Sequence, residues 1–183
     1  DPTLVLRPPG AWVPAPSRAR VWVDSDAEWD TIVDQLLQLG LVEVCDDVLL
    51  SAEGVEVSNG AFGVEKQGDM IDGGNLAVLR LIINLIPANA AQICVGGDAE
   101  GLPSQLQWAF FTLLEREYAV FSQTDRRCFF YIWRLRKAWR RFMVLSKRSR
   151  GRRLAVTVIA MEWLLAVEIC QHLHRNIVKR CGD

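Results

Sequence analysis

Asp125 is the residue whose type and surroundings most suggest chemistry. It lies in a stretch, residues 121–135, that is apolar enough to form a strand, and the aromatic pair Phe130 and Tyr131 begins five residues after it. A carboxylate at a strand end can bind a hard cation, because Mg²⁺ prefers carboxylate oxygen and keeps its other positions for water and phosphate. The same aspartate could instead cap a turn. Both interpretations stay open on these residues alone.

Charge divides the chain sharply, although its formal net charge is only −1 at pH 7. Residues 1–125 carry 6 Lys and Arg against 19 Asp and Glu, whereas residues 126–153 carry 12 Lys and Arg and no acid. A basic block of this density predicts an anion-binding surface, and nucleic acid is the commonest partner of such a surface. The alternative is a solvated basic face that pairs with the acidic N-terminal half.

Size and cysteine usage set further limits. The chain has 183 residues, of which 50% are hydrophobic, and this suits one globular domain or one domain with a small appendage. The 5 cysteines are widely spaced without a CxxC pair, which predicts neither a disulfide framework nor a zinc site. This usage favours a reducing compartment, and no basic-then-apolar signal peptide opens the chain. We therefore expect an intracellular protein, cytoplasmic or nuclear.

A membrane-spanning interpretation would rest on residues 154–170, which are mostly apolar and follow the basic run of residues 147–153. The apolar stretch contains Glu162 and Glu168. It also falls short of the ~20 apolar residues that a span requires. We therefore expect no membrane partner.

The N-terminal part divides into two segments. Residues 1–20 hold five of the 7 prolines, a spacing that no helix survives, so we expect an extended or disordered lead-in. Residues 21–58 contain a capping box followed by apolar residues at helical spacing, which predicts a helix that opens at Ser25 and runs through Leu39. Loose alternation over residues 41–57 predicts one or two short strands.

The remaining sequence predicts a hairpin and then a mixed unit. Residues 59–102 contain glycine-rich turns and an apolar run, which together predict a loose hairpin. Residues 103–183 predict a mixed unit with helices near residues 105–117 and 163–179. Strands are expected over residues 121–135, within residues 136–146 and over residues 154–159. The predicted fold class is therefore α+β, with antiparallel strands packed on two or three helices.

Three stretches follow the order of one known family. The first is Asn59-Gly-Ala-Phe-Gly-Val-Glu-Lys66, with Arg80-Leu-Ile-Ile-Asn84 and Asn89 after it. The second is Ser122-Gln-Thr-Asp125 with Phe130-Tyr131, and the third is Val158-Ile-Ala-Met-Glu-Trp163 with Gln171-His-Leu-His-Arg175. Together they resemble the fingers hairpin and the first two palm motifs of reverse transcriptases, the RNA-directed DNA polymerases. The resemblance covers residues 59–180 and implies a partial polymerase fingers–palm fold, with a fingers-like hairpin over residues 59–102 and a partial palm over residues 103–183.

The resemblance implies template-directed deoxynucleotide polymerisation with Mg²⁺, in which catalysis is mostly positioning and charge neutralisation. It assigns Asp125 to the metal and Phe130 to a gate that excludes a 2′-hydroxyl. The residues that it assigns to the deoxynucleoside triphosphate are Lys66, Arg80, Phe130, Tyr131 and Trp163. The residues that would follow the backbone of an RNA or DNA template–primer are Arg134, Arg136, Lys137, Arg140, Arg141, Arg152 and Arg153.

The chain departs from the family's pattern in its carboxylates and in its second palm motif. The third palm motif, two adjacent aspartates on a hairpin, is absent, and Cys128 stands where a second acid is frequent. Glu162 replaces the motif-two glycine, which lets the backbone approach substrate, and adds negative charge near an anionic triphosphate. Because one of three catalytic carboxylates is present, we expect an incomplete or degenerate copy that is inactive alone.

Other functions remain open. A non-catalytic nucleic-acid-binding module of the same ancestry would keep the basic block without the chemistry. An RNA-directed RNA polymerase uses a similar palm. Phe130 makes this function less favoured, because an aromatic gate disfavours ribonucleotides. A hydrolase is poorly supported, since the sequence contains neither a G-x-S-x-G elbow nor a G-x-x-x-x-G-K-[ST] loop.

Overall fold

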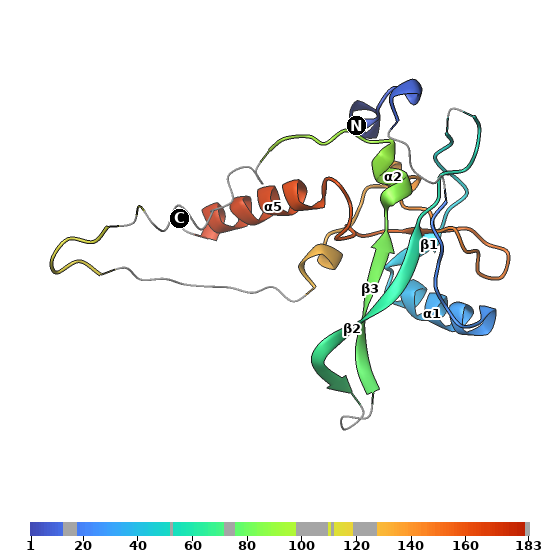
Figure 1. The fold of residues 1–183 in the computed structure, drawn as a ribbon, viewed down its shortest axis with the longest axis horizontal. Coiled ribbons are helices and arrows are strands. Elements are labelled where there is room, and N and C mark those ends of the chain that lie inside the picture. The colour runs from blue at the N-terminus through green and yellow to red at the C-terminus, as the bar shows by residue number, and fades with distance from the viewer. Residues whose placement is uncertain are drawn as a thin grey trace.

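A β-hairpin, two longer helices and a second small sheet are the main regular elements of the structure, a computed structural model that describes residues 1–12, 18–51, 53–71, 76–97, 110, 112–118 and 128–181 (Figure 1). Its elements in chain order are the 3-10 helices η1 (Pro2–Val5) and η2 (Pro9–Ala11), α1 (Asp26–Gln38), β1 (Val42–Val44), β2 (Gly60–Ile71), β3 (Leu76–Asn84), α2 (Ile86–Ala90), the 3-10 helix η5 (Phe129–Ile132), α4 (Lys137–Arg140), β4 (Leu154–Val156) and α5 (Ala166–Cys181). The predicted α+β class, with small antiparallel sheets, is confirmed.

The predicted hairpin is formed by β2 and β3, which pair antiparallel from Gly60 opposite Asn84 to Glu65 opposite Leu79. The register then shifts, and pairing resumes with Met70 opposite Ala77. The hairpin projects from the body of the molecule (Figure 1). At its base the segment around Arg20 runs so close to Gly60 that a methyl group there would overlap the Arg20 carbonyl oxygen. Glycine is therefore required at this position by close backbone approach.

Helix α1 confirms the predicted capping box. The Glu28 amide donates to Ser25 Oγ at 3.1 Å, and the Glu28 carboxylate accepts from the Asp24 amide at 2.8 Å. After the helix, Gly40 adopts the left-handed conformation (φ 65°) that ends many helices. The apolar face buries Trp29, Val33 and Leu36, as the helical spacing predicts. These residues pack into a core shared by the hairpin, by β1 paired with β4, and by the start of α5.

Asn59 connects the hairpin base to the segment that precedes β4. Its fully buried side chain donates from Nδ2 to the Phe142 carbonyl at 2.8 Å and to the Val144 carbonyl at 3.0 Å. Its backbone amide donates to Val144 O, and its carbonyl accepts from the Ser146 amide, both at 2.8 Å. One residue thus satisfies polar backbone groups of two segments that are far apart in the sequence.

The strand predicted over residues 121–135 is wrong for the part that the structure describes. Cys128 takes a left-handed conformation (φ 54°), and Phe129–Ile132 form η5. Only Arg134 makes a bridge, with Val158. The physical reason is that successive aromatic side chains contact different elements. Phe129 meets His174 of α5 edge-on, with ring centroids 6.1 Å apart, while Tyr131 bonds to β3, and a tight turn allows both contacts.

Two further expectations differ from the structure. Of the helix predicted over residues 105–117, residues 105–109 and 111 lie outside the described residues. Residues 112–117 are irregular, and Phe110 is 85% exposed, so no core contact supports a helix in its described part. The strand expected within residues 136–146 is reduced to isolated bridges at Val144 and Leu145 after the short helix α4. Before these bridges the backbone turns instead of extending: the Phe142 amide donates to the Trp139 carbonyl at 3.1 Å and the Met143 amide to the Arg140 carbonyl at 2.8 Å, so these amides are not available to a neighbouring strand.

The N-terminal residues also carry more local structure than the proline pattern predicts. Prolines occupy the first turns of η1 and η2, where a missing amide hydrogen costs no helical bond. Leu6 then bridges to Gln92, and the Arg7 guanidinium donates to the Gln92 carbonyl at 2.7 Å. The described part of this lead-in is therefore held against the body of the protein by specific contacts.

Helix α5 matches the predicted C-terminal helix but begins at Ala166 rather than near Trp163. Ala166 and Cys170 face the core, and burial raises the pKa of the Cys170 thiol to about 11. The thiol is therefore protonated at neutral pH and serves as a packing residue.

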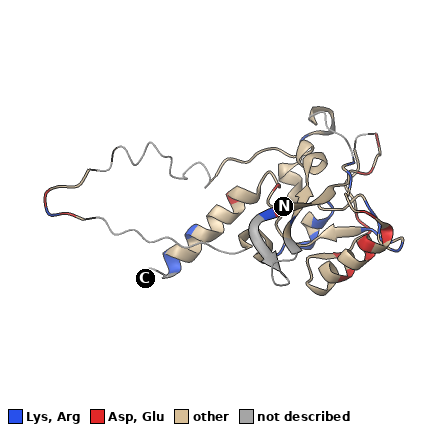
Figure 2. Cartoon of the chain, turned by 60° about the horizontal axis from the view of Figure 1, so that its bottom comes forward, with Lys and Arg blue, Asp and Glu red and all other residues tan. Residues whose placement is uncertain are grey.

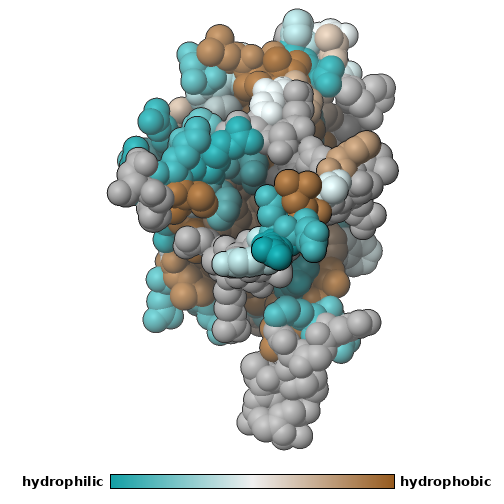
Figure 3. All heavy atoms as spheres, turned by 90° about the vertical axis from the view of Figure 1, so that its left-hand side faces the viewer, coloured by the Kyte–Doolittle hydropathy of each residue, from teal (hydrophilic) through white to brown (hydrophobic). Residues whose placement is uncertain are grey.

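From the side of the molecule shown in Figure 3, hydrophobic groups lie in several separate clusters among hydrophilic ones.

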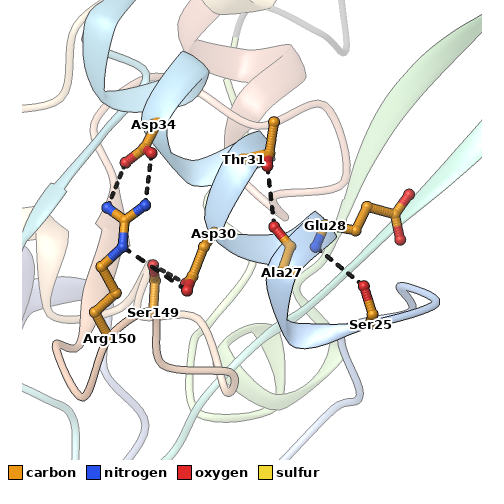
Figure 4. A network of polar contacts seen from close by, with 8 residues as sticks. All are labelled: Ser25, Ala27, Glu28, Asp30, Thr31, Asp34, Ser149 and Arg150. Atoms are coloured by element: carbon orange, nitrogen blue, oxygen red, sulfur yellow. Dashed lines mark hydrogen bonds and ion pairs between the residues drawn. The ribbon is translucent and has the colours of Figure 1, made fainter.

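The acidic face of α1 lies against the basic turn of residues 147–153 (Figures 2 and 4). Arg150 donates to both carboxylate oxygens of Asp34 at 2.7 Å, and the Ser149 hydroxyl donates to Asp30. Lys147 pairs with Asp26 at the start of the helix. We call this set of contacts the acid–base clasp. It shows that part of the basic block pairs with the acidic half of the chain.

The clasp depends on an unusual turn. Arg150 (φ 47°) and Gly151 (φ 77°) both have positive φ, and Ser149 pairs with Arg152 across them. This is the geometry of a two-residue hairpin turn, in which Gly is common and Arg is not. The bidentate contact of Arg150 with Asp34 helps to hold the arginine in this conformation.

Asp34→Asn tests the clasp. The hydrogen bond from Arg150 holds the Asp34 pKa below its ordinary value of 3.8, so the contact stabilises the folded protein above that pH and the stabilisation is lost as the pH falls through the lowered pKa. We expect the substitution to lower the unfolding midpoint at pH 7 by a small amount, on the order of 1 °C. The difference from wild type should narrow below pH 3.8.

The matched control is Asp47→Asn, which removes an exposed acid that forms no ion pair among the described residues. Thermal unfolding followed by circular dichroism across pH measures both variants. An equal effect of the two substitutions would show that only net charge matters.

Candidate nucleotide and nucleic-acid site

The hairpin carries two of the predicted triphosphate contacts, one on each strand. Arg80 of β3 lies opposite Val64 of β2, and Lys66 follows Val64 by two residues. Lys66 lies just beyond Glu65, where the register of the hairpin shifts, so Lys66 and Arg80 come from neighbouring parts of the two strands. Arg80 is exposed there. Their joint contact with a triphosphate stays a prediction.

The aromatic pair reaches this hairpin through η5. Tyr131 is half-buried, and its hydroxyl donates to the Leu81 carbonyl of β3 at 2.6 Å. Phe130 precedes it and packs edge-on against Phe129, with centroids 6.1 Å apart. Tyr131 thus docks η5 onto the strand that carries Arg80, beside the predicted gate residue Phe130.

Burial and nearby charged groups shift the pKa of the Tyr131 hydroxyl. Burial raises the pKa of the Tyr131 hydroxyl, and the nearby Cys128 and Glu162 act in the same direction, whereas the positive charge of Arg80 opposes them. Arg80 and Glu162 therefore lie within electrostatic range of one phenol, although they come from the hairpin and from the loop before α5. The fold has assembled members of all three sequence motifs at this point.

Asn89 holds the loop that carries Glu162. Its Nδ2 donates to the Glu162 carbonyl at 2.8 Å, and its Oδ1 accepts from the Leu164 amide at 3.0 Å. The side-chain amide therefore bonds to one backbone carbonyl and one backbone amide of the loop, as a neighbouring strand would. The sequence had shown Asn89 only as part of the hairpin pattern, and its clamping role could not be found without the tertiary structure.

Trp163 is placed in the core and not on a substrate surface. It is 2% exposed, its Nε1 donates to Gln92 Oε1 at 2.8 Å, and its ring meets Trp139 edge-on at 5.2 Å. An indole this buried supports the site by packing beneath the Glu162 loop. The assignment of Trp163 to substrate stays a prediction.

The metal prediction rests on Asp125, which lies outside the described residues. Within the described ranges, no group of three or more His, Cys, Asp and Glu side chains could hold a metal ion. The assignment of Mg²⁺ to Asp125 therefore stays a prediction.

Several cations of the basic block have structural partners. Arg134 donates to the Gly40 carbonyl and, at 3.3 Å, to the Leu39 carbonyl, and so caps the C-terminal end of α1. Arg140 pairs with Glu43 of β1, and the Arg140 side chain is only 16% exposed. Such contacts leave these guanidinium groups little freedom to follow a nucleic-acid backbone.

Arg153 is held in the same way, by an ion pair with Glu56 and by a hydrogen bond to the Asp46 carbonyl at 3.2 Å. Arg141 lies over the ring of its neighbour Phe142, with the guanidinium carbon 5.2 Å from the ring centroid.

A second group of predicted nucleic-acid contacts remains exposed. Arg136 and Lys137 lie at the start of α4, and Arg152 lies on the clasp turn. Among the residues that the structure describes, none of these three forms an ion pair. The structure therefore separates the cations held by hydrogen bonds, ion pairs or a ring contact from Arg136, Lys137 and Arg152, which the sequence could not do.

Tyr131 gives a direct test of the site's geometry. Replacing Arg80 with Met removes the positive charge that favours the phenolate, so the pKa of Tyr131 should rise further. Replacing Glu162 with Gln removes a negative charge, so the pKa should fall. The measurement is an absorbance titration of phenolate.

The chain has only 2 tyrosines, and Tyr118 is 84% exposed, so the two signals can be separated with Tyr131→Phe. Arg116→Met serves as the control for loss of an arginine elsewhere. If neither Arg80→Met nor Glu162→Gln changed the pKa of Tyr131, the three residues would not be neighbours.

Comparisons with known proteins give a fold and no family. No protein family model matches the chain, and no curated protein matches its sequence. Its structure is similar to that of the foamy viral protease–reverse transcriptase dRH in complex with double-stranded DNA, with a TM-score of 0.55 and 15% identity. The match covers 92% of this chain and 26% of that chain.

A second structure of the foamy viral protease–reverse transcriptase, also in complex with double-stranded DNA, matches with a TM-score of 0.51 and 14% identity. It covers 86% of this chain and 29% of that one, so the chain spans well under half of these neighbours. At such identity the likeness shows the fold alone.

In the described part of the chain, no helix has both the length and the apolar character to cross a membrane.

Proposed function

We propose that the chain is a reverse-transcriptase-like fingers–palm unit that takes part in template-directed deoxynucleotide polymerisation within a larger protein. The observation that carries this proposal is the meeting of three distant motifs at Tyr131: Arg80 of the hairpin, the aromatic pair, and the Glu162 loop. The fold likeness to a viral protease–reverse transcriptase over 92% of the chain supports it.

In this proposal the described residues bind and orient substrate. Lys66 and Arg80 contact the triphosphate, because ammonium and guanidinium groups suit phosphate oxygens. Phe130 lies under the sugar and excludes a 2′-hydroxyl. Asp125 is the residue that would hold Mg²⁺, which neutralises phosphate charge in polymerases.

Nucleic acid would lie along the exposed cations. Arg136, Lys137 and Arg152 are available for phosphate contacts, which position a duplex without reading its sequence. The similar foamy viral chains were solved in complex with double-stranded DNA, which agrees with a duplex as partner. We propose an RNA or DNA template–primer as the ligand.

One observation favours a second candidate, a non-catalytic nucleic-acid-binding module. Glu162 lies near Tyr131 together with Arg80, and its negative charge would repel a triphosphate that Arg80 attracts. With Asp125 as the single motif carboxylate in the sequence, the chain could retain nucleic-acid binding without chemistry.

Charge reversal separates the paired cations from the exposed ones. Replacing Arg136, Lys137 and Arg152 with Glu should weaken binding of an RNA–DNA hybrid and reduce the slope of log affinity against log salt by about 3, one for each lost phosphate contact. Fluorescence anisotropy of a labelled hybrid measures both.

The matched variant replaces Arg140 and Arg153, whose partners are Glu43 and Glu56, with Glu. Compared with the variant of the exposed cations, it should lower the unfolding midpoint more and weaken binding of the hybrid less. Equal loss of binding in both variants would place the duplex on the paired surface instead.

Glu162→Gln separates the two candidate functions. If the site binds nucleotide, removing this charge should tighten binding of deoxythymidine triphosphate several-fold, and Arg80→Met should weaken it. Calorimetry with and without Mg²⁺ gives the affinities, and Asp125→Asn should remove their dependence on Mg²⁺. No triphosphate binding by either the wild type or Glu162→Gln would favour the non-catalytic module.

A further inference from the structure

The core contains a cavity between α1 and the hairpin. It has a volume of about 140 Å³ and is walled by Trp29 and Leu36 of α1, Ala61 of β2, Leu81 of β3, Val158, and Tyr131 of η5 among others. Its wall is almost wholly apolar. Close-packed protein interiors rarely leave a void much larger than a water molecule, so a cavity of this size is unusual.

Water is a poor occupant of such a space. A buried water needs two to four polar partners, and an apolar cavity of about 150 Å³ stays dry and accepts benzene or xenon. The cavity is thus matched in size and surface to one small apolar ring.

The wall of the cavity is also part of the candidate site. Tyr131 and Leu81 both line it, and the Tyr131 hydroxyl donates to the Leu81 carbonyl at 2.6 Å. Arg80 and Phe130 are the residues that directly precede Leu81 and Tyr131. An occupant of the cavity would therefore contact both residues of the hydrogen bond that joins η5 to β3.

We propose that this cavity is a binding site for one small apolar molecule, about the size of a benzene ring, whose occupancy stiffens the junction of η5 with β3. The regulatory consequence, a change in nucleotide binding, rests on the function proposed above. The binding site itself and the stiffening do not depend on that function.

Benzene is the probe. Its addition to the full chain should raise the unfolding midpoint in a saturable way, because it binds the folded state only. Ala61→Val fills part of the cavity, and Val158→Leu adds one methylene to another wall. Each variant that folds should weaken benzene binding at least tenfold, whereas Ala90→Val, which adds the same atoms outside the cavity, should leave it unchanged.

Stiffening is measured by amide hydrogen exchange. Saturating benzene should slow exchange in residues 79–83 and 129–132 of the wild type and not in Ala61→Val. No saturable shift of the midpoint, a shift that survives both filling variants, or unchanged exchange at saturation would overturn the proposal.

A separate titration with deoxythymidine triphosphate distinguishes this proposal from the proposed function. If benzene binds and slows exchange while the triphosphate does not bind at all, the proposed function fails and the cavity site stands. If the triphosphate binds with equal affinity with and without benzene, the regulatory consequence fails.

Discussion

The buried amide of Asn59 is the interaction on which the remaining architecture depends. It bonds to the carbonyls of Phe142 and Val144, and its own backbone pairs with Val144 and Ser146. These contacts fasten the base of the hairpin to the segment that leads into β4, and so define where the hairpin leaves the core. Because buried polar groups must be satisfied, an apolar residue here would remove the side-chain donor from the Phe142 carbonyl and leave the Val144 carbonyl only the backbone amide of residue 59.

The acid–base clasp explains why the chain is so unevenly charged. The acidic face of α1 and the basic turn of residues 147–153 are complementary surfaces of one body, and other pairs such as Arg140 with Glu43 follow the same division. Segregated charge in a sequence thus has two causes here. One part stabilises the contact between the two halves of the chain, and the exposed part is free to attract a polyanion.

The candidate site shows how a fold brings weak motifs together. Each motif alone is short, but Tyr131 bonds to β3, Asn89 holds the Glu162 loop, and Trp163 supports that loop from the core. Residues that would contact a nucleotide are therefore positioned by residues that would not. The same junction also encloses the apolar cavity, which couples packing beneath the site to the geometry above it.

The sequence by itself determined the elements whose signals are local. The capping box of α1, the hairpin of β2 and β3, and the apolar strand β4 each follow from residues within one turn or one strand of each other. The tertiary structure decided what depends on distant partners. It turned Phe129–Ile132 into a 3-10 helix because Phe129 packs on α5 while Tyr131 bonds to β3. It also decided which cations are paired, because an arginine's partner, such as Glu43 for Arg140, lies far away in the chain and only folding brings the two together.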